Sequence, residues 1–210
     1  MRLSDKYRPK SLKEVIGQDK AVKIMERLTN RSWGGRAYWI AGNSGTGKTT
    51  LAWILARMQA HELYITEIVG RQLTANRLRD ISDKWHYRPM YGSGYALIVN
   101  EAHGLTKPVI EILLDVLENL PDNVLVVFTT TRDGQDLFEE QLDSSPFASR
   151  CISITLASRG LCEPFAQRAK AIAKSEGLDG KTLSDYIRLM KNCRNNMRMA
   201  LQQIEAGAML

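Results

Sequence analysis

The stretch YWIAGNSGTGKTTLAWILARM (residues 38–58) contains a phosphate-binding loop between an apolar strand and a helix. Gly42 ends the apolar run, and Gly47, Lys48 and Thr49 follow in the spacing G-x-x-x-x-G-K-[ST]. Glycines let the backbone curl so that its free N–H groups face an anion, and the helix that follows adds the positive end of its dipole. The pattern therefore predicts that this loop binds the phosphates of a nucleotide.

Two side chains of this loop have separate predicted roles in nucleotide binding. Lys48 reaches the terminal phosphates, and the Thr49 hydroxyl binds magnesium, so that the expected cofactors are ATP and Mg²⁺. A chance match in a glycine-rich turn is the alternative, but it leaves the flanking strand and helix unexplained. The predicted cofactor-binding residues here are Gly42, Asn43, Ser44, Gly45, Thr46, Gly47, Lys48, Thr49 and Thr50.

A second apolar run, YALIVNEAHG (residues 95–104), ends on two polar residues, Asn100 and Glu101. Glu101 is a candidate general base that positions the attacking water, with a surface carboxylate as the alternative. The position of Asn100 usually carries an aspartate of the metal shell. Removing one unit charge roughly 4 to 5 Å from a dication costs about a few kcal/mol at an effective dielectric near 20. We therefore expect Asn100 to hold Mg²⁺ weakly or through water, or else to be only a strand-end cap.

Apolar runs alternate with helical patterns from Tyr38 to about Thr155, which is typical of a parallel sheet covered by helices. The predicted strands are Ala37 to Ala41, Leu63 to Glu67, Tyr95 to Asn100, Val124 to Thr129 and Cys151 to Thr155. The predicted helices between them are Thr49 to Ala60, Thr74 to Lys84 and Pro108 to Leu120. The sequence thus predicts a three-layer α/β domain with a five-stranded parallel sheet over residues 1–156.

After Leu156 the strand patterns stop, and a small helical domain is expected over residues 157–210. Its predicted helices are about Arg159 to Glu176, Thr182 to Asn192 and Asn195 to Glu205. The segment RPMYGSG (residues 88–94) is a predicted loop because of its proline and glycines.

Composition bounds the class of protein. A formal charge of +6, from 29 Lys and Arg against 23 Asp and Glu, permits a polyanionic partner but is also found on ordinary solubilising surfaces. No apolar run approaches the roughly 20 residues of a membrane span, and no signal peptide is recognisable, so a cytoplasmic protein without a membrane partner is expected. Cys151, Cys162 and Cys193 fit neither a disulfide framework nor a zinc pattern.

The segment DKYRPKSLKEVIGQDKAV (residues 5–22), taken with the phosphate loop and the Ser-Arg-Cys at 149–151, resembles a known family. It is similar to clamp-loader ATPases of the AAA+ class, namely the replication factor C small subunits and the bacterial gamma/tau subunits. In that family the Tyr-Arg-Pro and Val-Ile-Gly-Gln elements pack around the adenine; an arm simply packed on the sheet is the alternative. The resemblance implies a base pocket lined by Tyr7, Arg8, Pro9, Val15 and Ile16.

Three further matches follow in the order of the family. VVFTTTRD places the sensor-1 residue on Thr131, with Thr130 as the alternative. SPFASRCISI places on Arg150 the arginine finger that is offered in trans to the ATP of a neighbouring subunit, and NNMRMALQQ places sensor 2 on Arg198. A fixed guanidinium matches developing phosphate charge better than a mobile ammonium. The resemblance thus implies a catalytic set of Glu101, Lys48, Thr131, Arg150 in trans and Arg198, with Arg198 also contacting the nucleotide.

Several positions depart from the family besides Asn100. Asn195 and Asn196 replace the Gly-Asp before sensor 2, and Leu114 and Asp115 stand where replication factor C subunits have arginines. The sequence ends at Leu210, and the collar domain of the family is absent from it.

The resemblance implies an ATP-binding and ATP-hydrolysing subunit that couples ATP to the binding and release of DNA and a sliding clamp. Its implied partners are other AAA+ subunits, in a homo- or hetero-oligomer, together with primed DNA and the clamp. Arg71, Arg77 and Arg79 lie in about the region that tracks DNA in clamp loaders, although a solvated helix face is an equal alternative. The rival function is a hydrolysis-poor regulatory AAA+ subunit that binds ATP and donates Arg150 to a partner.

Overall fold

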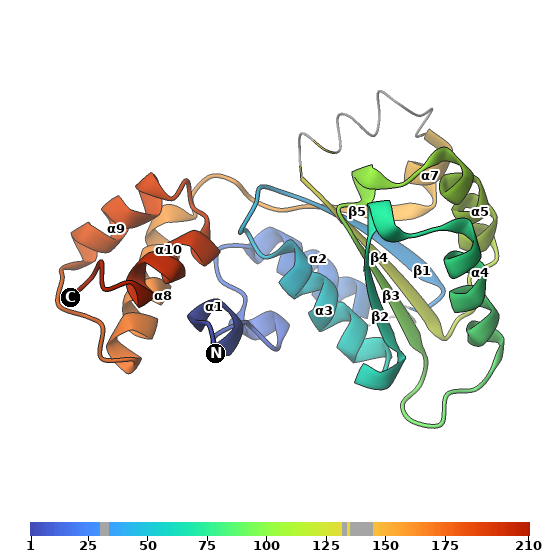
Figure 1. The fold of residues 1–210 in the computed structure, drawn as a ribbon, viewed down its shortest axis with the longest axis horizontal. Helices are drawn as coiled ribbons and strands as arrows, with labels where there is room; N and C mark the ends of the chain where they lie inside the picture. Colours follow the sequence, from blue (N-terminus) through green and yellow to red (C-terminus); the bar gives the residue numbers. More distant parts are fainter. Residues whose placement is uncertain (30–33, 132–133, 135–144) are drawn as a thin grey trace.

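The computed structural model describes residues 1–29, 34–131, 134 and 145–210. Within this part of the chain, five strands form one parallel sheet in the order β2-β3-β4-β1-β5 (Figure 1). The strands are β1 (Arg36–Ala41), β2 (Ile65–Val69), β3 (Tyr95–Asn100), β4 (Val124–Thr130) and β5 (Cys151–Thr155). The predicted five-stranded parallel sheet is confirmed, and its central position in the order belongs to β4.

Helices cover both faces of the sheet, which explains why the strands read as continuous apolar runs rather than alternating ones. All seven residues of β4 are buried. The face that carries the phosphate loop is covered by α2 (Asp19–Thr29) and α3 (Lys48–Gln59). The opposite face is covered by α4 (Ala75–Asp83), α5 (Lys107–Glu118) and α7 (Ser145–Ser149). Short 3-10 turns lie at η1 (Leu12–Glu14), η2 (Glu62–Tyr64), η3 (Gly70–Gln72), η4 (Lys84–His86) and η5 (Ala102–Gly104).

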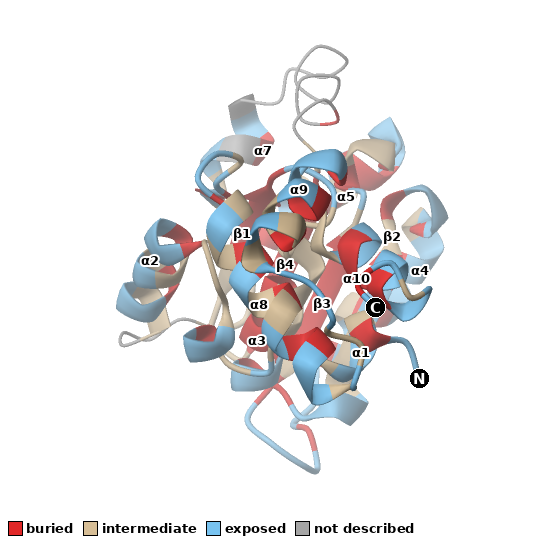
Figure 2. Ribbon diagram, turned by 90° about the vertical axis from the view of Figure 1, so that its left-hand side faces the viewer, coloured by how far each residue is buried: buried red, intermediate tan, exposed pale blue. Residues whose placement is uncertain are grey.

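Beyond the sheet, the helices α8 (Cys162–Ser175), α9 (Leu183–Asn192) and α10 (Met197–Glu205) pack around an apolar core of their own. We refer to them as the C-terminal helices. They stand to one side of the sheet in Figure 1, and their buried faces turn toward one another in Figure 2. No helix among the described residues is long and apolar enough to cross a bilayer.

The first nine residues, here called the N-terminal arm, pack on the C-terminal helices rather than on the sheet. The arm contains α1 (Leu3–Lys6), and Leu3 is buried in the core of those helices. The Leu3 N–H donates to Oε1 of Glu205 over 2.7 Å, and Lys6 pairs with Glu176 over 2.6 Å. The arm therefore belongs physically with the helices at the other end of the chain, and a division into domains at residue 156 stays a prediction.

Gln18 joins the two segments that connect the sheet to the C-terminal helices. It is 2% exposed, and its amide nitrogen donates to the carbonyl of Thr46 over 3.4 Å and to that of Ala157 over 3.2 Å. Its amide oxygen accepts from the Ala157 N–H over 2.7 Å. The start of α2, the phosphate loop and the segment after β5 thus meet at one buried side chain.

Element boundaries differ from the sequence predictions in places with identifiable causes. The second strand begins at Ile65, not at Leu63, because the His61 side chain accepts from the Leu63 N–H and starts a 3-10 turn. The first C-terminal helix begins at Cys162 rather than at Arg159. The predictions contained no helix before β1, where the structure has α2.

Candidate nucleotide-binding site

A cavity of about 280 Å³ opens where the carboxyl ends of the strands, the N-terminal arm and the C-terminal helices meet. Residues from these distant parts of the sequence line it together. The predicted site residues in its lining are Tyr7, Arg8, Pro9, Val15, Ile16, Ser44, Gly45, Thr46, Gly47, Lys48, Thr49, Thr50, Asn100, Glu101, Thr131 and Arg198. Gly42 and Asn43 lie directly behind this lining, where their carbonyls accept hydrogen bonds from Lys48 over 2.8 Å.

The phosphate loop follows β1 and turns directly into α3. Gly47 adopts φ 103°, a left-handed conformation that an L side chain rarely takes, and this lets α3 begin at Lys48. Gly42 is required for a different reason, because a Cβ atom there would lie 2.8 Å from Cβ of Leu156. Thr46 is 4% exposed and donates to the Asn43 carbonyl over 2.7 Å, which braces the loop from inside. The sequence therefore builds a closed turn at the N-terminus of a helix, the geometry that suits a bound phosphate.

Lys48 is the positive charge of the loop. Burial, and to a smaller extent the nearby charge of Arg198, lower the pKa of its ammonium to about 8, while Glu101 acts in the opposite direction. The positive groups of two different elements therefore converge on the cavity. An anion bound between them would relieve their repulsion and restore the full charge of Lys48.

Asn100 ends β3 beside the first turn of α3, and its amide is held at both ends. Its Oδ1 accepts from Thr49 Oγ1 over 3.2 Å and from Thr129 Oγ1 over 2.8 Å. Its Nδ2 donates to Oε1 of Glu67 over 2.6 Å. The sequence predictions placed Thr49 and Asn100 at a metal site, and the structure brings these two oxygen atoms together.

The donor set at this point fits magnesium. Mg²⁺ prefers oxygen ligands and commonly takes only one or two from the protein, with water and phosphate completing its shell. The Thr49 hydroxyl and the Asn100 amide oxygen are oxygen atoms of the kind that Mg²⁺ prefers. The described residues contain no group of three His, Cys, Asp or Glu side chains that could hold a metal without a phosphate.

Glu101 follows Asn100 in a left-handed conformation, with φ 52° and ψ 49°. Such a backbone costs a residue with a side chain on the order of 1 kcal/mol or more, and it persists only where the surroundings enforce it. Gly70, directly after β2, leaves room for this turn, because a Cβ atom there would lie 2.6 Å from the Glu101 carbonyl oxygen. The strained turn directs the Glu101 side chain into the cavity lining.

Two threonines, Thr129 and Thr130, end β4 at the cavity, and Thr131 follows the strand. Each of the three has a different partner. Thr131, the predicted sensor, accepts from the Gly134 N–H over 3.1 Å. Thr130, the alternative, contacts Nδ1 of His103 over 3.1 Å. Thr129, which the predictions missed, donates to Asn100. The available signal was its position at the end of the predicted strand Val124 to Thr129, because the carboxyl ends of parallel strands meet at one edge of the sheet.

The opposite end of the cavity is apolar and is formed between the N-terminal arm and the C-terminal helices. Ile172, Met197 and Leu201 face the predicted base pocket across the cavity. Tyr7 is fixed there by its hydroxyl, which lies 2.8 Å from Ser175 Oγ and also donates to Glu176. Arg168 also lines the cavity and was missed, because only the packing of α8 against the arm brings it there.

Arg198 reaches the cavity from the first turn of α10, just after an unusual turn. Arg194 and Asn195 have φ 50° and 58°, and the Asn196 side chain caps α10 by accepting from the Met199 N–H over 3.2 Å. Asparagine tolerates the left-handed region better than most residues and is a strong N-cap. Asn195 and Asn196 therefore take the conformations suited to glycine and aspartate, so this departure from the family pattern is structurally conservative.

Arg150 does not line the cavity of its own chain. It lies between α7 and β5, where its guanidinium donates to the Glu118 carboxylate and to the Pro146 carbonyl, the latter over 2.6 Å. The structure therefore separates Arg150 from the other predicted catalytic residues.

A phosphate loop at the carboxyl edge of a parallel sheet, faced by helices that carry an arginine, defines a P-loop nucleotide-binding protein of the α/β class. The family model described as "ATPase family associated with various cellular activities (AAA)" matches residues 38–153. The chain belongs to this AAA family.

Known proteins similar to the chain include bacterial replication subunits. It is 26% identical over 152 residues to DNA polymerase III subunit gamma of Buchnera aphidicola subsp. Schizaphis graminum, covering 61% of the chain and 42% of that protein. It is 28% identical over 221 residues to subunit gamma/tau of Mycoplasma pneumoniae, covering 92% of the chain and 32% of that protein. The resemblance to clamp-loader ATPases is thereby confirmed, although the chain spans well under half of these relatives.

Among solved structures, the chain is similar to the RuvB Holliday junction branch migration motor of Thermotoga maritima. The TM-score is 0.73 at 28% identity, over 95% of this chain and 64% of that one. Both kinds of relative act on DNA by name.

Proposed function

We propose that the chain binds and hydrolyses ATP as a subunit of a clamp-loader-type assembly, coupling ATP to the binding and release of DNA and a sliding clamp. The observation that carries this proposal is the convergence of the phosphate loop, two strand ends and Arg198 on one cavity, while Arg150 lies outside it. A site that is complete except for one arginine is what a subunit needs if its neighbour supplies that residue.

Within one subunit, the roles follow from position. Lys48 and the amides of the phosphate loop hold the phosphates, and Tyr7, Val15 and Ile16 enclose the base. Thr49 and Asn100 would hold Mg²⁺, which when bound neutralises phosphate charge. Glu101 lines the same cavity and accepts the proton of the attacking water.

Two further residues contact the nucleotide from other elements. Thr131 positions the nucleotide from the sheet, and Arg198 contacts it from α10. Because Arg198 belongs to the C-terminal helices, nucleotide in the cavity links those helices to the sheet, and we propose that they act as a lid.

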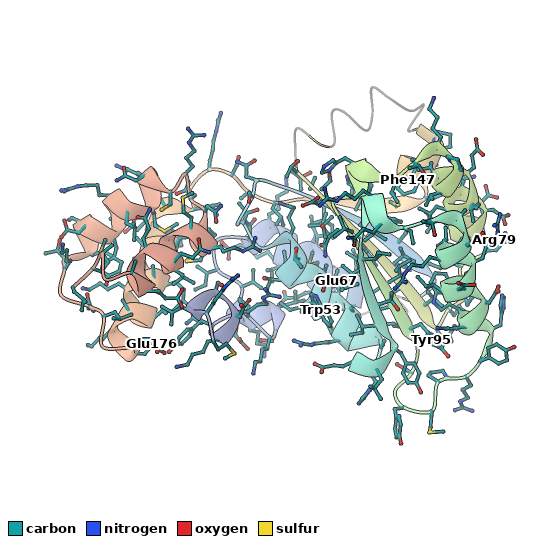
Figure 3. The ribbon with its side chains drawn as sticks, viewed as in Figure 1. Trp53, Glu67, Arg79, Tyr95, Phe147 and Glu176 are labelled. Atoms are coloured by element: carbon teal, nitrogen blue, oxygen red, sulfur yellow. The ribbon has the colours of Figure 1, made fainter. Side chains whose placement is uncertain are left out.

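Between subunits, Arg150 would act as the finger that stabilises the transition state in the neighbouring cavity. The partners are accordingly other AAA+ subunits. Primed DNA and a sliding clamp are proposed from the names of the gamma and gamma/tau relatives. Arg71, Arg77 and Arg79 are exposed near and on α4, and Figure 3 shows Arg79 directed away from the sheet. They can meet DNA phosphates or simply solvent.

The alternative is a regulatory subunit that binds ATP, hydrolyses it poorly and donates Arg150 to a partner. It is favoured by a single observation, the neutral amide of Asn100 at the metal site. Glu101 in the cavity lining argues against it, because a subunit without turnover has no need of a general base there.

Steady-state ATP hydrolysis separates these functions. The chain is assayed alone, with primed DNA, with primed DNA and a sliding clamp, and with a four-way junction, and Lys48→Ala reports any contaminating ATPase. Stimulation by primed DNA and clamp is expected. ATP binding without turnover in every condition would establish the regulatory alternative, and stimulation by the junction alone would favour a branch-migration motor like RuvB.

A further inference from the structure

A row of polar side chains crosses three neighbouring strands on the face that carries α3. Glu67 lies on β2, Asn100 ends β3 and Thr129 lies on β4, with Val69 of β2 opposite Asn100 in the register. Asn100 bonds to both of its neighbours, over 2.6 Å to Glu67 and 2.8 Å to Thr129. Figure 3 shows Glu67 on the α3 side of the sheet. Glu67 therefore stands directly behind the proposed metal ligand.

Glu67 determines which end of the Asn100 amide faces the phosphate loop. The two ends of an asparagine side chain are similar in shape, and only their hydrogen-bond partners distinguish them. An ionised carboxylate can only accept, so Glu67 selects the amide nitrogen. The oxygen is then left to face Thr49, 3.2 Å away. A residue at position 67 that cannot accept a hydrogen bond, or that can equally well donate one, loses this selection and permits the flipped amide, which presents N–H groups toward a cation.

Glu67 also brings a negative charge close to a site that lacks one. The charge lies one amide group away from the oxygen that faces Thr49. Because Glu67 is exposed, water and salt screen much of its field. Its main effect is therefore on orientation, with a smaller direct contribution from charge.

We propose that Glu67 is a positioning residue for magnesium, and that Glu67 and Asn100 together take the place of one aspartate. Asn100 supplies the oxygen, and Glu67 orients that oxygen and adds a screened negative charge. This inference rests on the proposed Mg²⁺-ATP site, and it adds a residue that the sequence predictions did not include.

The pairing of Glu67 with Asn100 predicts what happens when the usual aspartate is restored at position 100. Asn100→Asp alone would place two carboxylates within hydrogen-bond distance, and such a pair cannot easily hold both charges. The reversed pair, Glu67→Gln with Asn100→Asp, keeps one charge and one hydrogen bond, with the new amide as donor to the new carboxylate. The double variant should therefore be a better magnesium site than either single variant.

The first measurement uses the parent, both single variants and the double variant without nucleotide or metal. In Asn100→Asp, the carboxylates at positions 67 and 100 repel each other and neither has a hydrogen to donate to the other. In the double variant, the amide of Gln at position 67 donates to the carboxylate at position 100 instead. The thermal midpoint of Asn100→Asp at neutral pH should therefore be lower than that of the double variant.

The second measurement is the magnesium concentration that half-saturates binding of a fluorescent ATP analogue. Glu67→Gln should raise it by about tenfold, the low end of what loss of an outer-shell partner costs. The double variant should lower it below the parental value. Glu111→Gln, an exposed glutamate on α5 at the opposite face, is the matched control and should change nothing.

The outcomes separate this inference from the proposed function. If all proteins bind the analogue with the parental magnesium midpoint, and Asn100→Asp has the same thermal midpoint as the double variant, Glu67 is a surface carboxylate and the inference is overturned. If no protein, the parent included, binds the analogue at any magnesium concentration, the proposed function falls and the inference falls with it.

Discussion

Gly45 of the phosphate loop lies directly against Asn196 at the start of α10, because a Cβ atom at position 45 would overlap the amide oxygen of Asn196. Asn196 caps the helix that carries Arg198 into the cavity. The loop that would hold the phosphates and the helix that would sense them are therefore in van der Waals contact. A change of loop conformation on nucleotide binding would therefore shift the start of α10.

This contact predicts that Asn196→Ala affects more than stability. Loss of the N-cap should lower the free energy of unfolding by about 1 kcal/mol. ATP affinity should also fall, because α10 loses its register on the phosphate loop. Thr182→Ala is the matched control, since Thr182 caps α9 and does not line the cavity. Thermal denaturation and titration with a fluorescent ATP analogue check both, and equal affinity losses in the two variants would contradict the role of Asn196.

Lys48→Ala should abolish detectable ATP binding while the fold is retained. The side chain supplies the one ammonium among the described residues of the cavity lining and is partly buried. Analogue titration gives the affinity, and circular dichroism shows whether the variant is folded. Lys84→Ala, at an exposed position after α4, should bind like the parent. A folded Lys48→Ala protein with parental affinity would remove the basis for the phosphate-loop assignment.

The lowered pKa of Lys48, about 8, predicts that ATP affinity depends on pH. The phosphates prefer the protonated ammonium, so affinity should be constant below pH 8. Above that pH it should fall by up to about tenfold per pH unit. Arg198→Ala should move the onset to higher pH, because Arg198 is one cause of the lowered pKa. Affinity is measured from pH 6.5 to 9.5, and an onset that does not move would mean that Arg198 has no influence on Lys48.

Arg150 should act between chains. Arg150→Ala should bind ATP nearly normally yet lose turnover by on the order of 10³-fold, as other arginine fingers do. Glu101→Gln should also be inactive, for lack of a base. Mixing the two should restore activity, because an interface can then combine the intact finger of one protein with the intact base of the other. If the mixture does not hydrolyse ATP although light scattering shows that the two variants assemble together, Arg150 is a surface residue.

The elements predicted best from the sequence are those whose limits are set locally. The strand YALIVN ends where its apolar run meets Asn100, and β3 has the predicted bounds. The phosphate loop was recognisable because spacing and flanking elements specify it together. By contrast, α2 was overlooked although its sequence carries a helical pattern, with Ala21 and Met25 buried four residues apart.

The site residues that were missed owe their positions to tertiary neighbours. Glu67 was predicted only as the end of a strand, and nothing in its own segment indicates that it lies beside Asn100. Arg168 lies on α8, whose amphipathic sequence indicates only that one face of the helix is buried. It reaches the cavity only because α8 packs against the N-terminal arm. Strand order and helix docking decide such positions, and neither can be obtained from local pattern.

The buried amide of Gln18 sets how the two ends of the molecule can move. The chain crosses between the sheet and the C-terminal helices before α2 and again after β5, and Gln18 bonds to Ala157 across these crossings. Because Gln18 holds these two connecting segments together, they act as one pivot between the sheet and the C-terminal helices and not as two independent linkers. The same amide also holds the Thr46 carbonyl of the phosphate loop. A displacement of that loop therefore acts at this pivot. Because α8 and α9 extend away from the pivot, a small rotation there moves their far ends by a larger distance.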